Sequence, residues 1–274
     1  MADGSGDRWP PPFHGRSALV NELTDSGAVS SVCFSSGGDL LATAGERGVV
    51  LRLIGQEVEK VCLAATRPEL TVSNFAEVVD RFAFIDETGL YVLQVDTGDM
   101  RAMGVEDNEE LKPTSALCMS HDGRLVAAIS DRDGESEVWL FDVESGSKLC
   151  STDTGGGVMG AAFSPDGNIL GLGLQEGILR LFAVKRAQET SLGPHKHDDK
   201  VNHTDYIRCV SWSAGGDRVA TSGDDSKVAV FDLTEGETLW EYEDLSGCEQ
   251  SDRHSNPLNA TRVVWCGVVW CDMV

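Results

Sequence analysis

Residues 194–205 (PHKHDDKVNHTD) collect side chains that could bind a metal. Imidazole and carboxylate groups are suitable ligands, and this stretch supplies His195, His197, Asp198, Asp199 and His203. The stretch is polar, however, and connects two apolar, strand-like segments. Such connections normally run over the protein surface. The sequence therefore favours a solvated loop, and no metal site is predicted there.

Residues 171–177 (GLGLQEG) imitate a glycine-rich loop that binds a dinucleotide. The spacing is G-x-G-x-x-x-G, and the apolar run ILRLF that follows has the composition of a strand. Phosphate binding by such a loop requires the N-terminus of a helix at this position. The sequence therefore predicts no bound nucleotide and no other cofactor.

The cysteines do not form a zinc signature. Cys266 and Cys271 are spaced C-x4-C within residues 261–274, and no second Cys or His pair accompanies them. In a strand, a separation of five residues places two side chains on opposite faces. No secretory signal precedes the eight cysteines, and Cys33, Cys118 and Cys209 lie in apolar runs that favour buried free thiols. We expect a cytoplasmic or nuclear protein that is not secreted.

The net charge of −23 limits the classes of partner. An excess of carboxylates repels nucleic acid and anionic membranes, and it favours proteins with basic surfaces. No apolar run approaches the roughly 18 residues that a membrane-spanning helix needs. The sequence also lacks the G-x-S-x-G and H-E-x-x-H motifs of common hydrolases. The prediction is a protein that is not an enzyme and binds neither nucleic acid nor membrane.

The elements that would position these residues repeat along the chain. Similar segments begin at Val29, Thr114, Val158 and Ile207, and each contains a strand, a glycine turn and two further strands. An apolar anchor followed by serine recurs in them, at Phe34, Met119, Phe163 and Trp212. Met119 and Phe163 are 44 residues apart, and Phe163 and Trp212 are 49 apart. A less regular copy of the unit at residues 71–99 fills the longer gap between the first two anchors. A period in the forties with several short strands is typical of propeller blades.

The fifth unit resembles the WD-repeat β-propeller family. The resemblance lies in a loop histidine, a hydroxyl residue in the second strand, an acid in the next turn and an aromatic–Asp pair: His203, Thr221 or Ser222, Asp225, and Phe231–Asp232. It implies a hydrogen-bonded network within the blade, which here lacks an indole donor because Phe replaces Trp. The third unit ends in Phe–Asp and the fourth in Phe–Ala. Similarity as a pattern covers about residues 28–245, with a fainter likeness to echinoderm-microtubule-associated-protein-like propellers.

The predicted fold is all-β, a β-propeller of about five blades and an incomplete sixth. The blades are expected near residues 28–65, 69–105, 113–154, 157–193 and 204–243, with a partial blade at 261–274. The tail 1–27 contains a candidate ring-closing strand at 16–23. The last segment, 261–274, has the pattern of a first blade strand without its successors. A truncated family member is one interpretation of that pattern.

The resemblance implies a non-catalytic scaffold that docks proteins on its faces, and a candidate subunit of a multiprotein complex. Two alternatives stay open. One is a propeller hydrolase of lactonase type with a central metal ion, for which Asp153, Asp205 and Asp225 lie near strand ends. The other is a structural subunit whose open edge another chain completes.

Overall fold

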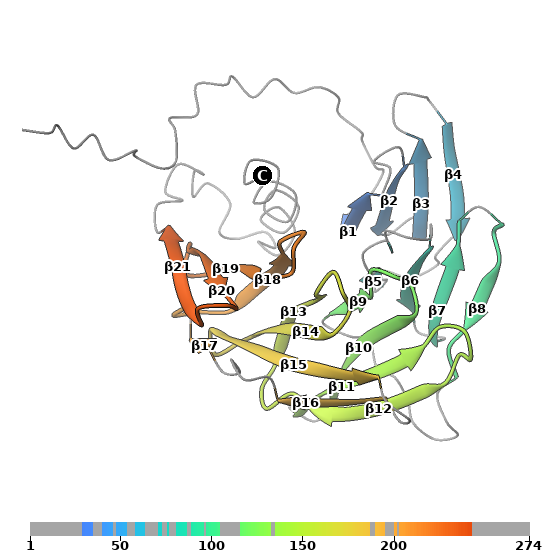
Figure 1. Cartoon of the computed structure of the whole chain (residues 1–274). Coiled ribbons are helices and arrows are strands. Elements are labelled where there is room, and N and C mark those ends of the chain that lie inside the picture. The colour runs from blue at the N-terminus through green and yellow to red at the C-terminus, as the bar shows by residue number, and fades with distance from the viewer. Residues whose placement is uncertain are drawn as a thin grey trace, which may run out of the picture.

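The computed structural model describes residues 29–242 outside the following short segments: 35–39, 46–47, 54–57, 64–70, 73–75, 77–80, 87–88, 96, 105–115, 133–134, 187–189, 195–199 and 202. Within this part of the chain, every regular element is a β-strand, as Figure 1 shows. The described residues thus form the all-β structure expected from the alternating apolar pattern.

Five antiparallel sheets follow one another along the chain. The first contains β1 (Val29–Phe34), β2 (Leu40–Gly45), β3 (Gly48–Leu53) and β4 (Val58–Leu63). The second contains β5 (Thr71–Val72), β6 (Arg81–Asp86), β7 (Gly89–Gln94) and β8 (Met100–Ala102). The third contains β9 (Leu117–Met119), β10 (Leu125–Arg132), β11 (Glu135–Asp142) and β12 (Lys148–Asp153).

The fourth sheet contains β13 (Val158–Phe163), β14 (Ile169–Leu174), β15 (Ile178–Arg186) and β16 (Thr190–Pro194). The short strand β17 (Lys200–Val201) also pairs with β15, so this sheet extends beyond the expected boundary at residue 193. The fifth contains β18 (Ile207–Trp212), β19 (Arg218–Gly223), β20 (Val228–Asp232) and β21 (Glu237–Tyr242). Each sheet follows chain order, which is the strand arrangement of a propeller blade.

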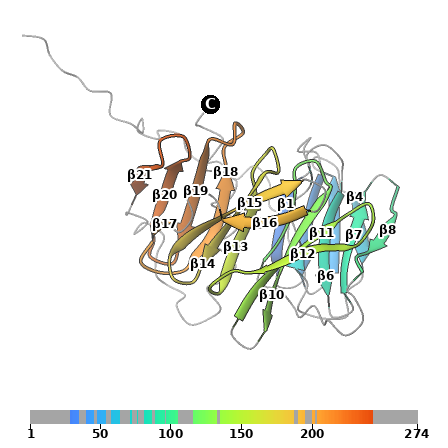
Figure 2. The ribbon, with the colours of Figure 1, turned by 60° about the horizontal axis from the view of Figure 1, so that its bottom comes forward.

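The sheets stand side by side in an arc, seen along its axis in Figure 1 and tilted in Figure 2. The first strands of the sheets (β1, β5, β9, β13 and β18) line the inner side, and the last strands lie outside. Consecutive inner strands touch one another. This arrangement is that of a β-propeller, in which each sheet is one blade.

The hydrophobic core lies between blades. Successive residues of β10 face opposite sides of the sheet, as the strand period requires. Val126 and Ala128 pack in the cluster shared with the second blade, whereas Ala127 and Ile129 pack in the cluster shared with the fourth. Because each blade contributes both of its faces, its apolar residues bury fully only when a neighbour stands on each side.

Three of the four anchors occupy these inter-blade clusters. Met119, Phe163 and Trp212 are 1%, 8% and 9% exposed, and each packs with residues of the preceding blade. Phe34, the anchor of the first blade, is 59% exposed. None of the described sheets precedes β1, so the surface that buries the other anchors has no counterpart among the described residues.

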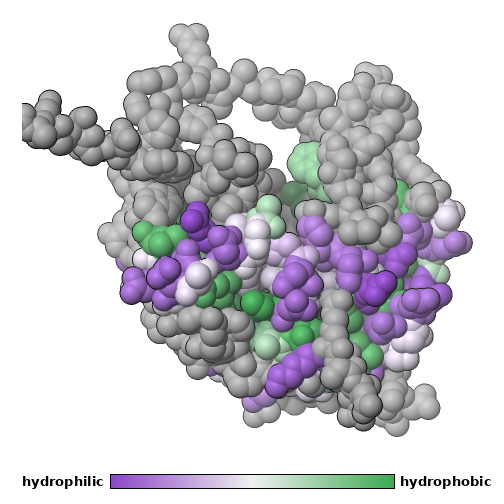
Figure 3. Space-filling view, viewed as in Figure 1, coloured by the Kyte–Doolittle hydropathy of each residue, from purple (hydrophilic) through white to green (hydrophobic). Residues whose placement is uncertain are grey.

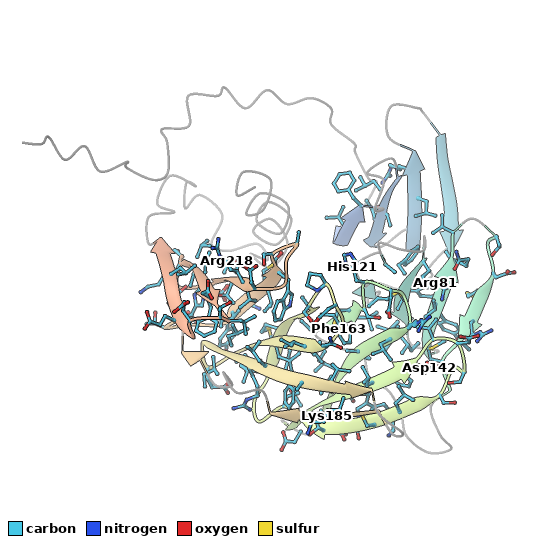
Figure 4. The ribbon with its side chains drawn as sticks, viewed as in Figure 1. Arg81, His121, Asp142, Phe163, Lys185 and Arg218 are labelled. Carbon is cyan, nitrogen blue, oxygen red and sulfur yellow. The ribbon has the colours of Figure 1, made fainter. Side chains whose placement is uncertain are left out.

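The turn between the first and second strands carries a repeated side-chain network. In the fourth blade, the Ser164 hydroxyl donates to Asp166 Oδ1 at 2.6 Å and accepts the Ile169 N–H at 2.9 Å. Burial alone would raise the pKa of Asp166, but hydrogen bonds from Ser164 and Asn168 outweigh it and hold the pKa below its ordinary value. The third blade repeats the network with Ser120 and Asp122. Figure 4 labels Phe163 and His121, which lie toward the inner side of the arc at these turns.

The glycines of residues 171–177 serve packing. Gly171 and Gly173 lie within β14, and a Cβ on Gly173 would stand 2.5 Å from Ile207 Cγ2 of the next blade. Gly177 ends the β14–β15 turn with φ +75°, where a Cβ would meet the His203 carbonyl oxygen at 2.2 Å. The second and third strands of the fourth blade follow one another at this turn, so no helix begins there. Close approach of two blades explains the spacing that imitates a dinucleotide loop.

Ser226 occupies the matching turn position in the fifth blade with φ +62°. Left-handed backbone is strained for a residue with a Cβ, so Ser226→Gly is expected to raise the free energy of unfolding by about 0.5–1 kcal/mol. The reciprocal change, Gly177→Ser, should lower it by about 2–3 kcal/mol because the added Cβ meets backbone. Urea unfolding of both variants checks the pair. Destabilisation by Ser226→Gly would show that the serine side chain contributes more than its backbone strain costs.

Candidate functional site

The loop face of the fifth blade holds a buried side-chain network around His203. The residue is 3% exposed, with Nδ1 2.9 Å from Asp225 Oδ1 and Nε2 2.9 Å from Thr221 Oγ1. A carboxylate can only accept, so Nδ1–H donates to Asp225 Oδ1, and Nε2 is hydrogen-bonded to the Thr221 hydroxyl. The network joins the loop before β18, the strand β19 and the β19–β20 turn.

Asp225 is the centre of charge in this network. Its side chain is 4% exposed, and its carboxylate also accepts the N–H groups of Thr204 at 2.9 Å and Lys227 at 3.1 Å. Burial acts to raise the pKa of Asp225, but the hydrogen bonds from His203, Thr204 and Lys227 outweigh it and lower the pKa below 3.8. The carboxylate is therefore ionised at neutral pH and fixes the entry of the chain into β18.

The other predicted network residues point elsewhere. Ser222 is adjacent to Thr221 on β19 and consequently faces the opposite side of the sheet. Phe231 is buried in the inter-blade cluster with Trp212, and a phenyl ring has no hydrogen to donate. Asp232 lies at the far end of β20, where it accepts the N–H groups of Thr234 at 2.7 Å and Glu235 at 3.0 Å. The structure brings together His203, Thr221 and Asp225 from the predicted set.

The depressed pKa of Asp225 predicts an acid-dependent contribution to stability. A carboxyl group with a lowered folded pKa stabilises the fold above its ordinary pKa of 3.8, and this contribution disappears as the pH falls through the folded pKa. Asp225→Asn should therefore be less stable than the wild type at pH 7, and the difference should shrink on acidification. Urea midpoints at several pH values measure it, with the exposed Asp99→Asn as control. A difference that stays constant down to low pH would contradict the assignment.

A second cluster beside this network was not predicted. Tyr206 and Arg208 are two residues apart, and the Arg208 guanidinium lies 5.0 Å from the centroid of the Tyr206 ring. Arg208 also forms an ion pair with Asp224, with Nη2 2.6 Å from Oδ2, and this hydrogen bond raises the pKa of the guanidinium. The i, i+2 spacing is only a weak sequence signal for this contact, because Tyr206 precedes β18 and the pairing of β18 with β19 shifts register between Ile207 and Cys209.

The carboxylates considered for a hydrolase do not form a metal centre. Asp153 Oδ1 accepts the Gly155 N–H at 2.7 Å, Asp205 Oδ1 accepts the Tyr206 N–H at 2.8 Å, and Asp225 belongs to the histidine network. In the described part of the chain, no group of three or more His, Cys, Asp or Glu residues could hold a metal ion. These acids bind turns of the backbone.

The thiols differ from one another. Cys118 is a buried free thiol, and burial raises its pKa. Cys209 is disulfide-bonded, so the expectation of a free thiol is wrong at that residue. Burial in an apolar strand does not by itself keep a thiol reduced, because pairing depends on which cysteine the fold brings near.

Several predicted features lie outside the described residues. They are the tail with its candidate closing strand at 16–23, the metal-ligand types at 195–199, and the partial blade at 261–274 with its two cysteines. Separately, no helix among the described residues has the length and apolar character to cross a membrane.

Comparison with known proteins agrees with the blade architecture. The family model "WD domain, G-beta repeat" matches residues 17–51 and 198–232. The chain is 29% identical over 153 residues to the meiotic recombination protein rec14 of Schizosaccharomyces pombe, which covers 55% of this chain and 46% of that protein. It is 25% identical over 181 residues to the cilia- and flagella-associated protein 251 of Pongo abelii, covering 64% of this chain and 15% of that protein.

The chain thus spans about half the length of one curated relative and a small part of the other. The two matched repeats include strands of the first and fifth blades, and three sheets of the same strand order lie between them. The two repeat matches, the relatives and the blade architecture support a similarity of this chain to the WD-repeat family.

Proposed function

We propose that this protein is a non-catalytic scaffold that docks other proteins on the loop faces of its propeller. The observation that carries the proposal is the fixed spacing between blades. Trp212 Nε1 donates to the Ala162 carbonyl oxygen of the preceding blade at 3.1 Å. Arg101 of the second blade donates to the carbonyl oxygens of Val143, at 3.2 Å, and Glu144 of the third. Loops from different blades therefore hold constant relative positions, which lowers the entropy cost of binding a partner.

The charge of the chain supports basic partners. A net charge of −23 attracts proteins with basic surfaces, speeds encounter at low salt and opposes binding to nucleic acid or anionic membrane. On the face seen in Figure 3, hydrophilic residues form a broken band with small hydrophobic areas between them, as expected of a polar binding surface. We infer that the protein acts as a subunit of a complex in the cytoplasm or nucleus.

The printed names of the two relatives refer to meiotic recombination and to cilia and flagella. These settings differ, and neither alignment covers more than about half of the relative. Similarity to WD-repeat proteins supports docking in general and no particular pathway.

Affinity capture from a cell lysate tests the proposal. The folded protein should recover a reproducible set of basic proteins at about 150 mM salt, and higher salt should weaken their capture because surface charges are then screened. Two controls are needed: an unrelated acidic protein of similar charge, and the same chain unfolded in urea and then diluted. Recovery no greater than that of the acidic control would remove the support for a scaffold.

A second candidate role is a structural subunit completed by another chain. The exposure of Phe34, whose equivalents in three other blades are buried, favours this role. Light scattering of the purified wild type should then show association, and Phe34→Ser should return the protein to a monomer. A wild type that is already monomeric at high concentration would leave this role without support.

A further inference from the structure

The ring of Tyr206 forms an exposed platform beside the inner strand of the fifth blade. The residue is 37% exposed and immediately precedes β18, which lines the inner side of the arc in Figure 1. Arg208 lies over the ring, 5.0 Å from its centroid. We call Asp205, Tyr206, Arg208 and Asp224 the Tyr206 platform.

Hydrogen bonds hold the platform rigid. The Tyr206 N–H donates to Asp205 Oδ1 at 2.8 Å, and its carbonyl oxygen accepts the Asp224 N–H at 2.9 Å. Arg208 Nε lies 2.9 and 3.0 Å from the two carboxylate oxygens of Asp224. Its Nη1 contacts Met159 Sδ of the neighbouring blade at 3.1 Å. A partner meeting this ring would not have to order it first, so little entropy is lost on binding.

The charges of the platform determine whether it attracts a cation or an anion. Asp224 neutralises Arg208 through a bidentate ion pair, and Asp205 adds a further carboxylate next to the ring. The net charge of the four residues is negative, within a chain whose net charge is −23. An anionic group would be repelled by the carboxylate of Asp205, because Arg208 offsets the charge of Asp224. A cation gains from the Asp205 carboxylate and from the negative face of an aromatic ring.

We propose that the Tyr206 platform is the docking position for an arginine side chain of a basic partner segment. Arginine suits it better than lysine, because a planar guanidinium both stacks on an aromatic ring and bonds a carboxylate with two N–H groups. Exposed, preorganised tyrosine is also a common centre of protein interfaces. This inference rests on the proposed scaffold function and specifies one of its contacts.

Fluorine NMR of protein labelled with 3-fluorotyrosine tests the platform directly. The chain has three tyrosines, and Tyr206→Phe assigns the signal of residue 206. The probe is an acetylated Gly-Ser-Arg repeat peptide at about 150 mM salt, where distant charges are screened. The Tyr206 signal should shift with this peptide, less with a Gly-Ser-Lys peptide and not with a Gly-Ser-Glu peptide. Tyr91, whose ring stacks on Phe84 at 5.3 Å, is the internal control and should not shift.

Variants give the affinity change. Tyr206→Ala should weaken binding of the arginine peptide about five-fold, the factor expected for a cation–π contact of about 1 kcal/mol. Asp205→Asn should weaken it as well, whereas Tyr206→Phe should retain most of it. Leu239→Ala, an exposed apolar change on β21, and Glu237→Gln, an acid change on the same strand, are the matched controls. If Tyr206→Ala does not fold, the wild-type fluorine titration alone decides.

Two results would contradict the proposed arginine contact. One is a Tyr206 signal that does not respond to the arginine peptide. The other is an equal loss of peptide affinity in Asp205→Asn and Glu237→Gln. The second result would mean diffuse attraction by the whole acidic surface. If the Tyr206 signal does not respond but partners are still captured from lysate, the arginine contact is refuted and the scaffold function is not. A shifted Tyr206 signal without any captured partner refutes the scaffold function and leaves the arginine contact.

Discussion

Trp212→Ala is expected to lower the free energy of unfolding by about 3–5 kcal/mol, the usual cost of removing a large buried aromatic side chain. Trp212 is 9% exposed and packs with Leu179 and Leu181 of the preceding blade. Its Nε1 also donates to the Ala162 carbonyl oxygen, so the alanine variant loses packing and a hydrogen bond between two blades together. Equilibrium unfolding in urea, followed by circular dichroism, gives the change.

Two companion variants separate the contributions. Trp212→Phe keeps most of the ring volume and loses the indole donor, so it should cost about 1–2 kcal/mol. Leu239→Ala removes an apolar side chain that is 50% exposed on β21, and its effect should stay within about 0.5 kcal/mol. If Trp212→Ala is as stable as Leu239→Ala, this anchor does not hold the fourth and fifth blades together.

His203→Ala is expected to cost about 2–4 kcal/mol, because it leaves the Asp225 carboxylate and the Thr221 hydroxyl without their shared partner. The N–H groups of Thr204 and Lys227 still bond Asp225, which limits the penalty. The loss should appear in the unfolding midpoint and in faster hydrogen exchange at the β19–β20 turn.

A double-mutant cycle distinguishes the network from simple loss of volume. Once Asp225 has been changed to Ala, removal of His203 should cost much less than it does in the wild type, because no buried charge remains to be compensated. Thr221→Val supplies the conservative control, since it removes the hydroxyl at nearly constant shape. Additive losses for His203 and Asp225 would contradict a coupled network.

The blade architecture could be predicted from the sequence because its signals are local. Alternation of apolar residues, glycine at the turns and a period in the forties each depend on residues close together in the chain. The expected anchors Met119, Phe163 and Trp212 are buried as this pattern implies. The same pattern could not show that Phe34 is exposed, because its burial depends on a neighbouring blade and on nothing within its own strand.

The site could be predicted only in part. Residue types at family spacing pointed to His203 and Asp225, but they left Thr221 and Ser222 as alternatives. The platform at Tyr206 could not be predicted from the sequence, because a whole hairpin separates Tyr206 from its partner Asp224 and the register of that hairpin decides that they meet. The turn between β18 and β19 shows the same limit. The Ser213 hydroxyl donates to Asp217, four residues later, whereas the Ser164 hydroxyl donates to Asp166, two residues later.

By itself the sequence determined the strands, the turns, the repeat and the sign of the charge, since these follow from residue type and short-range spacing. The tertiary structure alone decided which hydroxyl meets His203, why Gly171 and Gly173 stand where they do, and which anchor stays exposed. Strand register and the approach of neighbouring blades set these features. Both arise from contacts between residues that are distant in the chain, and spacing along the chain does not encode such contacts.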